Sequence, residues 1–301
     1  GIKTLPAVQE SADSYRRFII RDGDSVVRHW LRQGASGWRL DVADELPDDF
    51  IAEIRSAMDQ EKPDSFLLGE VWEDGSNKIA YSQRRRYLLG SETNGLMNYP
   101  FRTAALDWLR GGDAACFRGT MEVIREHYPR PAFYSALNIL GTHDTPRILT
   151  LLGAEDVPDT KDGRAAYRLS PAQRQKGQAR LRVGEMLLYC FPGSPTVYYG
   201  DEAGMEGFED PLNRGTYPWG REDQELLAFF RQLGQLPGQI RRLHAEQTAE
   251  KKRPSKQQHE QRQHAHARRQ PAGKPRPRLQ QPHRLFREQA DRKPDEERPQ
   301  H

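Results

Sequence analysis

Acidic residues stand directly after short apolar segments that have the length and composition of β-strands. The four such positions are, in chain order, Asp41, Glu70, Asp144 and the pair Asp201-Glu202. If these segments are neighbouring parallel strands, their carboxyl ends lie on one rim of a barrel, which is where such folds place catalysis. A carboxylate nucleophile paired with a carboxylic acid is the chemistry of retaining glycosidases, whose two carboxyl groups lie about 5–5.5 Å apart.

Each of these acids also has a simpler explanation. One carboxylate after a strand is more often a helix N-cap or a loop charge than a catalyst, and we keep that explanation for Asp201 and Glu202. An acid lies at or just after the end of each of the other three strands. Arg39 lies two residues before Asp41, and His143 directly precedes Asp144. Like charges that converge repel one another unless a site uses them, so the repetition favours a catalytic rim.

The elements that would carry these residues alternate between strand and helix. Strands are expected at residues 37–42, 65–71, 95–99, 136–141 and 195–199. Helices are expected at residues 26–31, 47–58, 76–89, 102–109, 114–127, 171–189 and 223–233. A strand followed by a helix, five times over, indicates βα units and a parallel sheet.

The composition excludes several classes of protein. With 301 residues and 36% hydrophobic content, the chain is long enough for one large domain or two ordinary ones. Two cysteines exclude a disulfide scaffold. The longest apolar run, Met186–Phe191, is far shorter than the roughly 20 residues of a membrane helix. With no signal segment at the start and two unpaired cysteines, we expect a cytoplasmic location.

Residues 235–301 differ in composition from the rest of the chain. Residues 244–301 hold 15 Lys+Arg against 8 Asp+Glu, a charge of +7, which leaves −4 for residues 1–243. We therefore expect a partial barrel over residues 1–234 and a disordered, basic Gln/His/Pro/Arg-rich tail over 235–301. Three explanations of this tail remain open: a solvated extension, a nucleic-acid or metal-binding segment, and an out-of-frame translation product. We favour the out-of-frame product.

Four segments resemble signature regions of the α-amylase superfamily, glycoside hydrolase family thirteen, in order and with matching spacing. They are Gly37–Ala43, Gly69–Trp72, Gly141–Asp144 and Gly193–Glu202, and Lys3–Pro6 is similar to a stretch of cyclomaltodextrinase- and neopullulanase-like members. The resemblance implies an α/β fold, a (β/α)₈ TIM-type barrel, of which the chain holds about strands four to eight. The family's first signature, an Asp followed by Asn-His, has no counterpart, so we expect the chain alone to be inactive.

Carried over by position, the resemblance implies a role for each residue of the rim. Asp41 would be the nucleophile, Glu70 the general acid/base, and Asp144 the carboxylate that stabilises the oxocarbenium-like transition state. The residues implied to contact substrate are Arg39, His143, Trp72, Arg147, Asp210 and Arg214. Without the resemblance, Trp72 is also compatible with a position in the core. Arg147, Asp210 and Arg214 are then also compatible with surface ion pairs.

The resemblance implies a retaining glycoside hydrolase that cleaves α-1,4-glucosidic bonds in maltooligosaccharides, cyclodextrins or starch-type glucans. An α-glucan transglycosylase or α-glucosidase on the same site, and a non-catalytic carbohydrate-binding relative, remain alternatives. The chemistry needs no cofactor, and a structural Ca²⁺ ion is compatible with it. We expect an α-glucan as partner, and neither nucleic acid nor a membrane, and the resemblance leaves a homodimer open.

Overall fold

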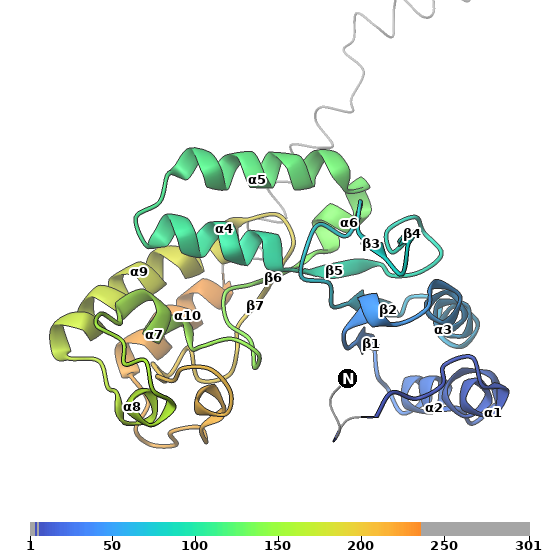
Figure 1. Ribbon diagram of the computed structural model, residues 1–301, viewed down its shortest axis with the longest axis horizontal. Coiled ribbons are helices and arrows are strands. Elements are labelled where there is room, and N and C mark those ends of the chain that lie inside the picture. The colour runs from blue at the N-terminus through green and yellow to red at the C-terminus, as the bar shows by residue number, and fades with distance from the viewer. Residues whose placement is uncertain (1–3, 5, 236–301) are drawn as a thin grey trace, which may run out of the picture. The chain divides into compact units, whose positions relative to one another are not determined.

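The computed structural model describes residue 4 and residues 6–235 of the chain. Its centre is a five-stranded, wholly parallel sheet with the strand order β1-β2-β5-β6-β7. The strands are β1 (Gly37–Leu40), β2 (Phe66–Gly69), β5 (Gly95–Asn98), β6 (Leu137–Ile139) and β7 (Ser194–Thr196). Neighbours in the sheet follow one another along the chain, which is the connectivity of a (β/α) barrel (Figure 1). All five predicted strands are therefore confirmed.

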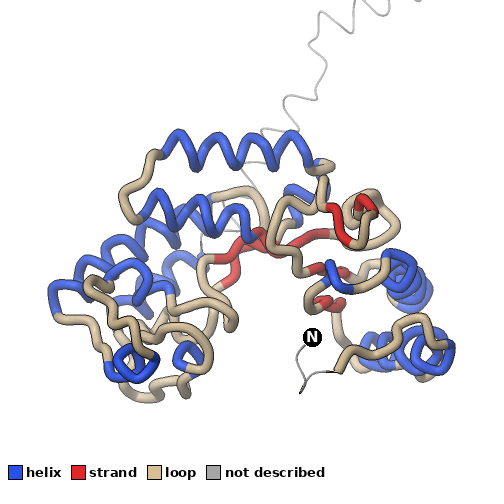
Figure 2. The backbone as a smooth tube through the Cα atoms, viewed as in Figure 1, coloured by secondary structure: helices blue, strands red, loops and turns tan. Residues whose placement is uncertain are grey.

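Helices lie around the strands and connect β1 to β2, β5 to β6 and β6 to β7, as Figure 2 shows. They are α1 (Asp13–Arg16), α2 (Val26–Arg32), α3 (Asp48–Glu61), α4 (Tyr99–Leu109), α5 (Ala114–His127), α6 (Arg130–Ser135), α7 (Ile148–Gly153), α8 (Lys161–Ala166), α9 (Pro171–Cys190) and α10 (Gln224–Gln235). A π-helical turn spans Arg17–Arg21, and 3₁₀ turns span Ala43–Glu45 and Leu212–Arg214. No described helix combines the length and apolar character that crossing a bilayer requires.

Local sequence signals account for the start of the longest helix. The Ser170 side chain accepts the backbone N–H of Gln173, and the Gln173 side chain in turn accepts the N–H of Ser170. This reciprocal capping satisfies two backbone donors that a helix end leaves unpaired. Pro171 occupies the first helical turn, where its missing N–H costs nothing.

The two faces of the sheet are packed differently. The outer face and the helices share one large core, to which Ile51, Met58, Leu67, Phe101 and Leu181 belong. A second, small cluster consists of Leu68, Met97, Tyr99 and Ile139 with Leu137 packed against it. Because side chains alternate across a strand, the residues two positions beyond this inner cluster also point to the inner face at the strand ends. Glu70, two residues after Leu68, is one of them.

The predicted helix over residues 76–89 is wrong. The segment contains a short antiparallel hairpin, β3 (Ile79–Ala80) and β4 (Gln83–Arg84), whose turn has positive φ angles of 53° and 61° at Tyr81 and Ser82. The apolar residues of this segment do not form one buried stripe, since Ile79 and Tyr81 are exposed while Tyr87 is fully buried. Without a stripe, the segment has no helical face to pack.

The ends of the predicted units and elements also differ from the structure. The described strands are one to several residues shorter than predicted, and the short helices α1, α6, α7 and α8 were not predicted. The predicted tail, residues 235–301, lies outside the described residues except for Gln235. Within the described part, β1 and β7 each pair with a single strand and form the two sheet edges.

Candidate functional site

Strand register brings Asp41 and Glu70 to adjacent positions on the inner face. Arg39 on β1 lies opposite Leu68 on β2. Asp41 follows Arg39 by two residues, and Glu70 follows Leu68 by two residues. Alternation then points all four side chains to the same side of the sheet. The pairing of two parallel strands is thus enough to place two carboxylates side by side at the rim.

Arg39 joins these two carboxylates. Its Nη1 donates a hydrogen bond to Oδ1 of Asp41, and its Nη2 lies 2.8 Å from Oε2 of Glu70. The environments of the two acids differ, because the Asp41 side chain is 72% exposed and that of Glu70 only 3%. One acid is therefore open to an incoming substrate, while the other is held by protein groups.

A sharp backbone turn after β1 helps to hold Glu70. Val42 adopts a left-handed conformation with φ 42° and ψ 56°, which is unusual for a β-branched residue. In this conformation its backbone N–H donates to Oε2 of Glu70 at 2.9 Å. Backbone strain of this kind persists where surrounding structure enforces it, often at functional sites.

Two aromatic residues bind the second oxygen of Glu70. Trp72 Nε1 and the Tyr99 hydroxyl donate to Oε1 at 3.2 Å and 3.3 Å. The two rings stack with centroids 4.1 Å apart and planes 12° apart. Burial, and the negative charges of Glu70 and Asp144 to a lesser extent, raise the pKa of Tyr99 to about 12, so its hydroxyl keeps its proton near neutral pH.

Asp144, on the loop that follows β6, lies close to a histidine and an arginine. His143 Nε2 lies 3.1 Å from its Oδ2, and Arg214 Nη2 lies 3.5 Å from its Oδ1. The Nε atom of Arg214 pairs in turn with Oδ1 of Asp210 at 2.7 Å. The structure therefore brings together four of the predicted site residues that come from two distant stretches of sequence.

Arg147 does not face the open rim. It is fully buried, and its Nη1 donates to the Tyr199 carbonyl and lies 3.2 Å from Oδ1 of Asp201. Its guanidinium also lies over the rings of Tyr198 and Tyr199, 4.2 Å and 4.6 Å from their centroids. Contact with a substrate, predicted from the sequence, is not open to a buried side chain in this position, which instead ties two loops together.

Asp201 is the buried partner of that arginine. Burial raises the pKa of Asp201 to about 7, against the opposing effect of the nearby Arg147 cation. Glu185 on α9, which is 1% exposed, has its pKa raised well above the usual range by burial and by the charge of Asp201. Asp201 is thus a structural acid beneath the rim, in keeping with the non-catalytic explanation preferred for it.

Two residues of the site were missed by reasoning from the sequence. Tyr99 follows β5 as the acids follow their strands, so the strand-end rule would have found it had it been applied to every polar residue. Asn213 lies between Asp210 and Arg214 and is fully buried. No spacing or composition signal distinguishes Asn213, because its partners lie 70 and 68 residues away.

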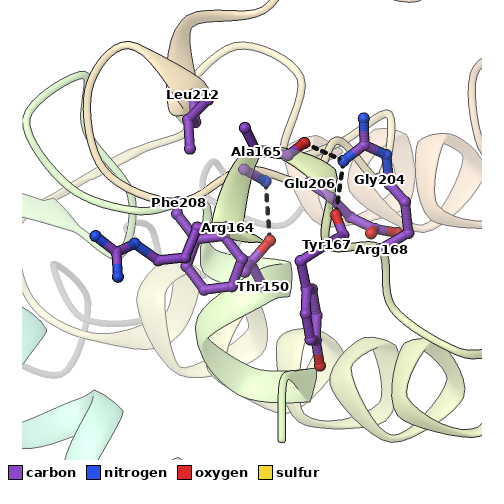
Figure 3. Close-up of a pocket in the computed structure, with 10 residues that line it drawn as sticks. Thr150, Arg164, Ala165, Tyr167, Arg168, Gly204, Glu206, Phe208 and Leu212 are labelled. Carbon is purple, nitrogen blue, oxygen red and sulfur yellow. Dashed lines mark hydrogen bonds between the residues drawn. The ribbon is translucent and has the colours of Figure 1, made fainter. Parts of the chain in front are cut away.

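A cavity separate from the rim lies against α7 and α8. It has a volume of about 340 Å³, and its lining includes Thr150, Arg164, Tyr167, Arg168 and Phe208, as Figure 3 shows. Arg168 Nη1 is already bonded to the carbonyls of Ala165 and Tyr167 (Figure 3). None of the predicted site residues lines this cavity. In the described stretch of the chain, no group of three or more His, Cys, Asp or Glu is arranged to hold a metal ion.

These features define a class of protein. Five parallel strands in chain order, helices around them and acids at the carboxyl ends of the strands are the arrangement of (β/α) barrel enzymes. Asp41 and Glu70 are a pair of neighbouring carboxyl groups, and most glycoside hydrolases use such a pair.

The comparison with protein families is more specific. Residues 3–275 match the family described as alpha amylase, catalytic domain, and the chain belongs to that family. This confirms the predicted resemblance and the barrel fold.

Individual relatives agree with this assignment. An amylopullulanase from Thermoanaerobacter thermohydrosulfuricus is 36% identical over 257 residues, covering 77% of this chain and 16% of the relative. A cyclomaltodextrinase from Geobacillus thermopakistaniensis is 31% identical over 247 residues, covering 80% and 36%. The chain thus spans well under half the length of these relatives.

Solved structures show the same fold. A cyclic α-maltosyl-(1→6)-maltose hydrolase from Arthrobacter globiformis matches with a TM-score of 0.55 and 30% identity, covering 69% of this chain and 41% of that one. A debranching enzyme from Nostoc punctiforme matches with a TM-score of 0.61 and 26% identity, covering 76% and 44%.

Proposed function

We propose that the whole protein is a retaining glycoside hydrolase that cleaves α-1,4-glucosidic bonds in maltooligosaccharides, cyclodextrins or starch-type glucans. The observation that carries the proposal is the pair of acids joined by Arg39, one open to solvent and one buried among donors. The named activities of the relatives, amylopullulanase and cyclomaltodextrinase, support a glucan as the substrate.

The two acids divide the reaction between them. Asp41 attacks the anomeric carbon, while Glu70 gives its proton to the glycosidic oxygen as the bond from carbon to that oxygen breaks. The product is a glycosyl ester on Asp41 and a free sugar. Glu70, now a carboxylate, takes a proton from water, and the resulting hydroxide displaces Asp41. Both residues return to their starting state, and the configuration at the anomeric carbon is retained.

Other residues of the rim act on the sugar. Asp144, about one-third exposed, faces the region where positive charge develops on the ring. His143 and Arg214 contact Asp144 and are themselves more than two-fifths exposed, which leaves their remaining donors free for sugar hydroxyls. Trp72 is 47% exposed and offers an apolar surface beside Glu70. The chain itself supplies the three acids, so the proposed chemistry uses no cofactor. A structural Ca²⁺ ion would take no part in the reaction.

The alternatives are weaker. A transglycosylase or an α-glucosidase would use the same acids, and no contact in the site favours either. The presence of all three acids at the rim argues against a non-catalytic carbohydrate-binding relative. Both cysteines, Cys116 and Cys190, are free, and on this basis we propose a cytoplasmic location.

The roles of the acids can be tested in the whole protein. Glu70→Gln should lose about 10²–10⁴-fold in kcat on maltooligosaccharides but much less on aryl α-glucosides, whose leaving groups need little acid help. Asp41→Asn should lose activity on both substrates. Asp107→Asn, at an exposed position on α4, is the matched control and should leave kcat unchanged. Equal losses on both substrates for Glu70→Gln would contradict the assignment.

A further inference from the structure

Asn213 makes an unusual pair of contacts with the loop that carries Asp144. Its side-chain Nδ2 donates to the carbonyl oxygen of His143 at 2.7 Å and to that of Thr145 at 2.8 Å. These are the carbonyls of the residues on either side of Asp144. Both N–H groups of one amide are thus used to hold the backbone around a single acid.

The chemistry of the contact suits asparagine. A side-chain amide offers two N–H donors from one nitrogen and carries no charge. An aspartate of the same shape offers no donor when ionised, so it would repel both carbonyl oxygens. Asn213 is fully buried, and its Oδ1 has no hydrogen-bond partner among the described residues. The position of the side chain therefore satisfies the two hydrogen bonds that Nδ2 donates, and it leaves Oδ1 without a partner among the described residues.

Other hydrogen bonds hold the same loop at further points. The backbone N–H of Asp144 donates to Thr142 Oγ1 at 3.2 Å, within the same loop. Further along, the N–H of Arg147 donates to the Gly207 carbonyl, and the N–H of Gly207 donates to Thr150 Oγ1, both at 2.9 Å. The segment after β7 thus lies along the loop after β6. Arg214 of this segment contacts the Asp144 carboxylate, and Asn213 contacts the backbone on both sides of Asp144.

We propose that Asn213 is a positioning residue that fixes the direction of the Asp144 carboxylate by holding the two peptide carbonyls beside it. The inference rests on the proposed glycosidase function, in which Asp144 must face the developing charge on the sugar. Displacement of a catalytic group by about 1 Å can cost on the order of 10²-fold in rate, so the amide would act on turnover more than on substrate binding.

The test compares two isosteric substitutions in the whole protein. Asn213→Asp should lower kcat on maltooligosaccharides about 10²-fold while KM stays within about threefold. The matched control is Asn138→Asp, because Asn138 is also fully buried and its Nδ2 donates to the Pro192 carbonyl at 3.0 Å, away from Asp144. The control should lower the melting temperature but leave kcat within about threefold of the unsubstituted protein.

A fall in kcat for Asn213→Asp no larger than for the control would overturn the proposal, and so would a change confined to KM. If Asn213→Asp does not fold, Asn213→Ala, which adds no charge, is measured in the same way. If the unsubstituted protein hydrolyses no glucan, the proposed function fails by itself. Hydrogen exchange of residues 142–147 then tests the contact alone: faster exchange in the Asn213 variant than in the control supports it, and equal exchange contradicts it.

Discussion

Arg39 Nη2 lies 2.8 Å from the Glu70 carboxylate while its Nη1 bonds the Asp41 carboxylate, so one guanidinium serves two acids. The two nitrogens of a guanidinium hold a fixed spacing that an ammonium group cannot reproduce. The geometry therefore sets where the Asp41 and Glu70 carboxylates lie relative to one another.

We predict that Arg39→Lys lowers kcat on maltooligosaccharides by about 10²-fold, because a single ammonium cannot contact both acids in their present positions. Thermal unfolding should also shift to lower temperature, since the buried Glu70 loses the guanidinium nitrogen that now lies 2.8 Å from it. Steady-state kinetics and a melting curve measure the two effects. Arg118→Lys, at an exposed arginine on α5, should change neither. Wild-type turnover in Arg39→Lys would show that the bridge is dispensable.

Trp72 combines two contacts that substitution can separate. Trp72→Phe keeps an aromatic ring to stack on Tyr99 but removes the Nε1–H that donates to Glu70. We expect kcat to fall by about 10–10²-fold with KM nearly unchanged, because a hydrogen bond to a charged group contributes about 1.5–3 kcal/mol. Trp72→Ala should in addition raise KM, as the sugar loses an apolar surface. Trp30→Phe, at an exposed tryptophan on α2, serves as control. A rise in KM alone for Trp72→Phe would mean that the indole nitrogen has no part in turnover.

How far the sequence predicts this site can be judged from individual residues. Asp41 and Glu70 were predictable, because strand alternation and parallel register alone bring them together. The direction of Arg147 was not, since its burial depends on Tyr198, Tyr199 and Asp201 from a segment more than 50 residues away. Local patterns report which face of a strand a residue occupies, but they carry no information on how two loops meet.

The hairpin after β2 illustrates a second limit. Residues 76–89 contain apolar groups in numbers that suit a helix, yet Arg85 is almost fully buried and bonds the carbonyls of Asp44 and Leu46. A polar side chain that caps a distant loop in this way overrides the local preference of its own segment. Such a contact becomes visible only once the loop after β1 is in place.

The shared guanidinium also predicts the stereochemistry of the products. An inverting enzyme keeps its carboxyl groups about 6.5–9.5 Å apart to admit a water molecule, whereas a retaining one keeps them about 5–5.5 Å apart. Two acids that contact one guanidinium fit the shorter separation. Proton NMR during early hydrolysis of a maltooligosaccharide should therefore show the α-anomer first. Initial release of the β-anomer would refute the double-displacement mechanism.

The last prediction concerns stability and pH. Glu92 is fully buried, neither of its carboxylate oxygens has a hydrogen-bond partner among the described residues, and the Arg86 Nε lies 3.6 Å away. Burial, with the nearby charge of Asp48, raises the pKa of Glu92 from 4.5 to about 7. Between these two values the folded protein binds the proton more tightly than the unfolded chain. Stability from this group therefore falls as pH rises through that window, and the loss is complete above about pH 7.

Glu92→Gln removes this titration, because an amide stays neutral throughout. The melting temperature of the variant minus that of the unsubstituted protein should become more positive from about pH 5 to about pH 8. The change should amount to several degrees, since each pKa unit is worth about 1.4 kcal/mol. Glu122→Gln, which removes an exposed carboxylate on α5, should give a difference that does not vary with pH in this way. A difference for Glu92→Gln that stays constant, or shrinks toward alkaline pH, would show that Glu92 is already ionised in the folded protein at low cost.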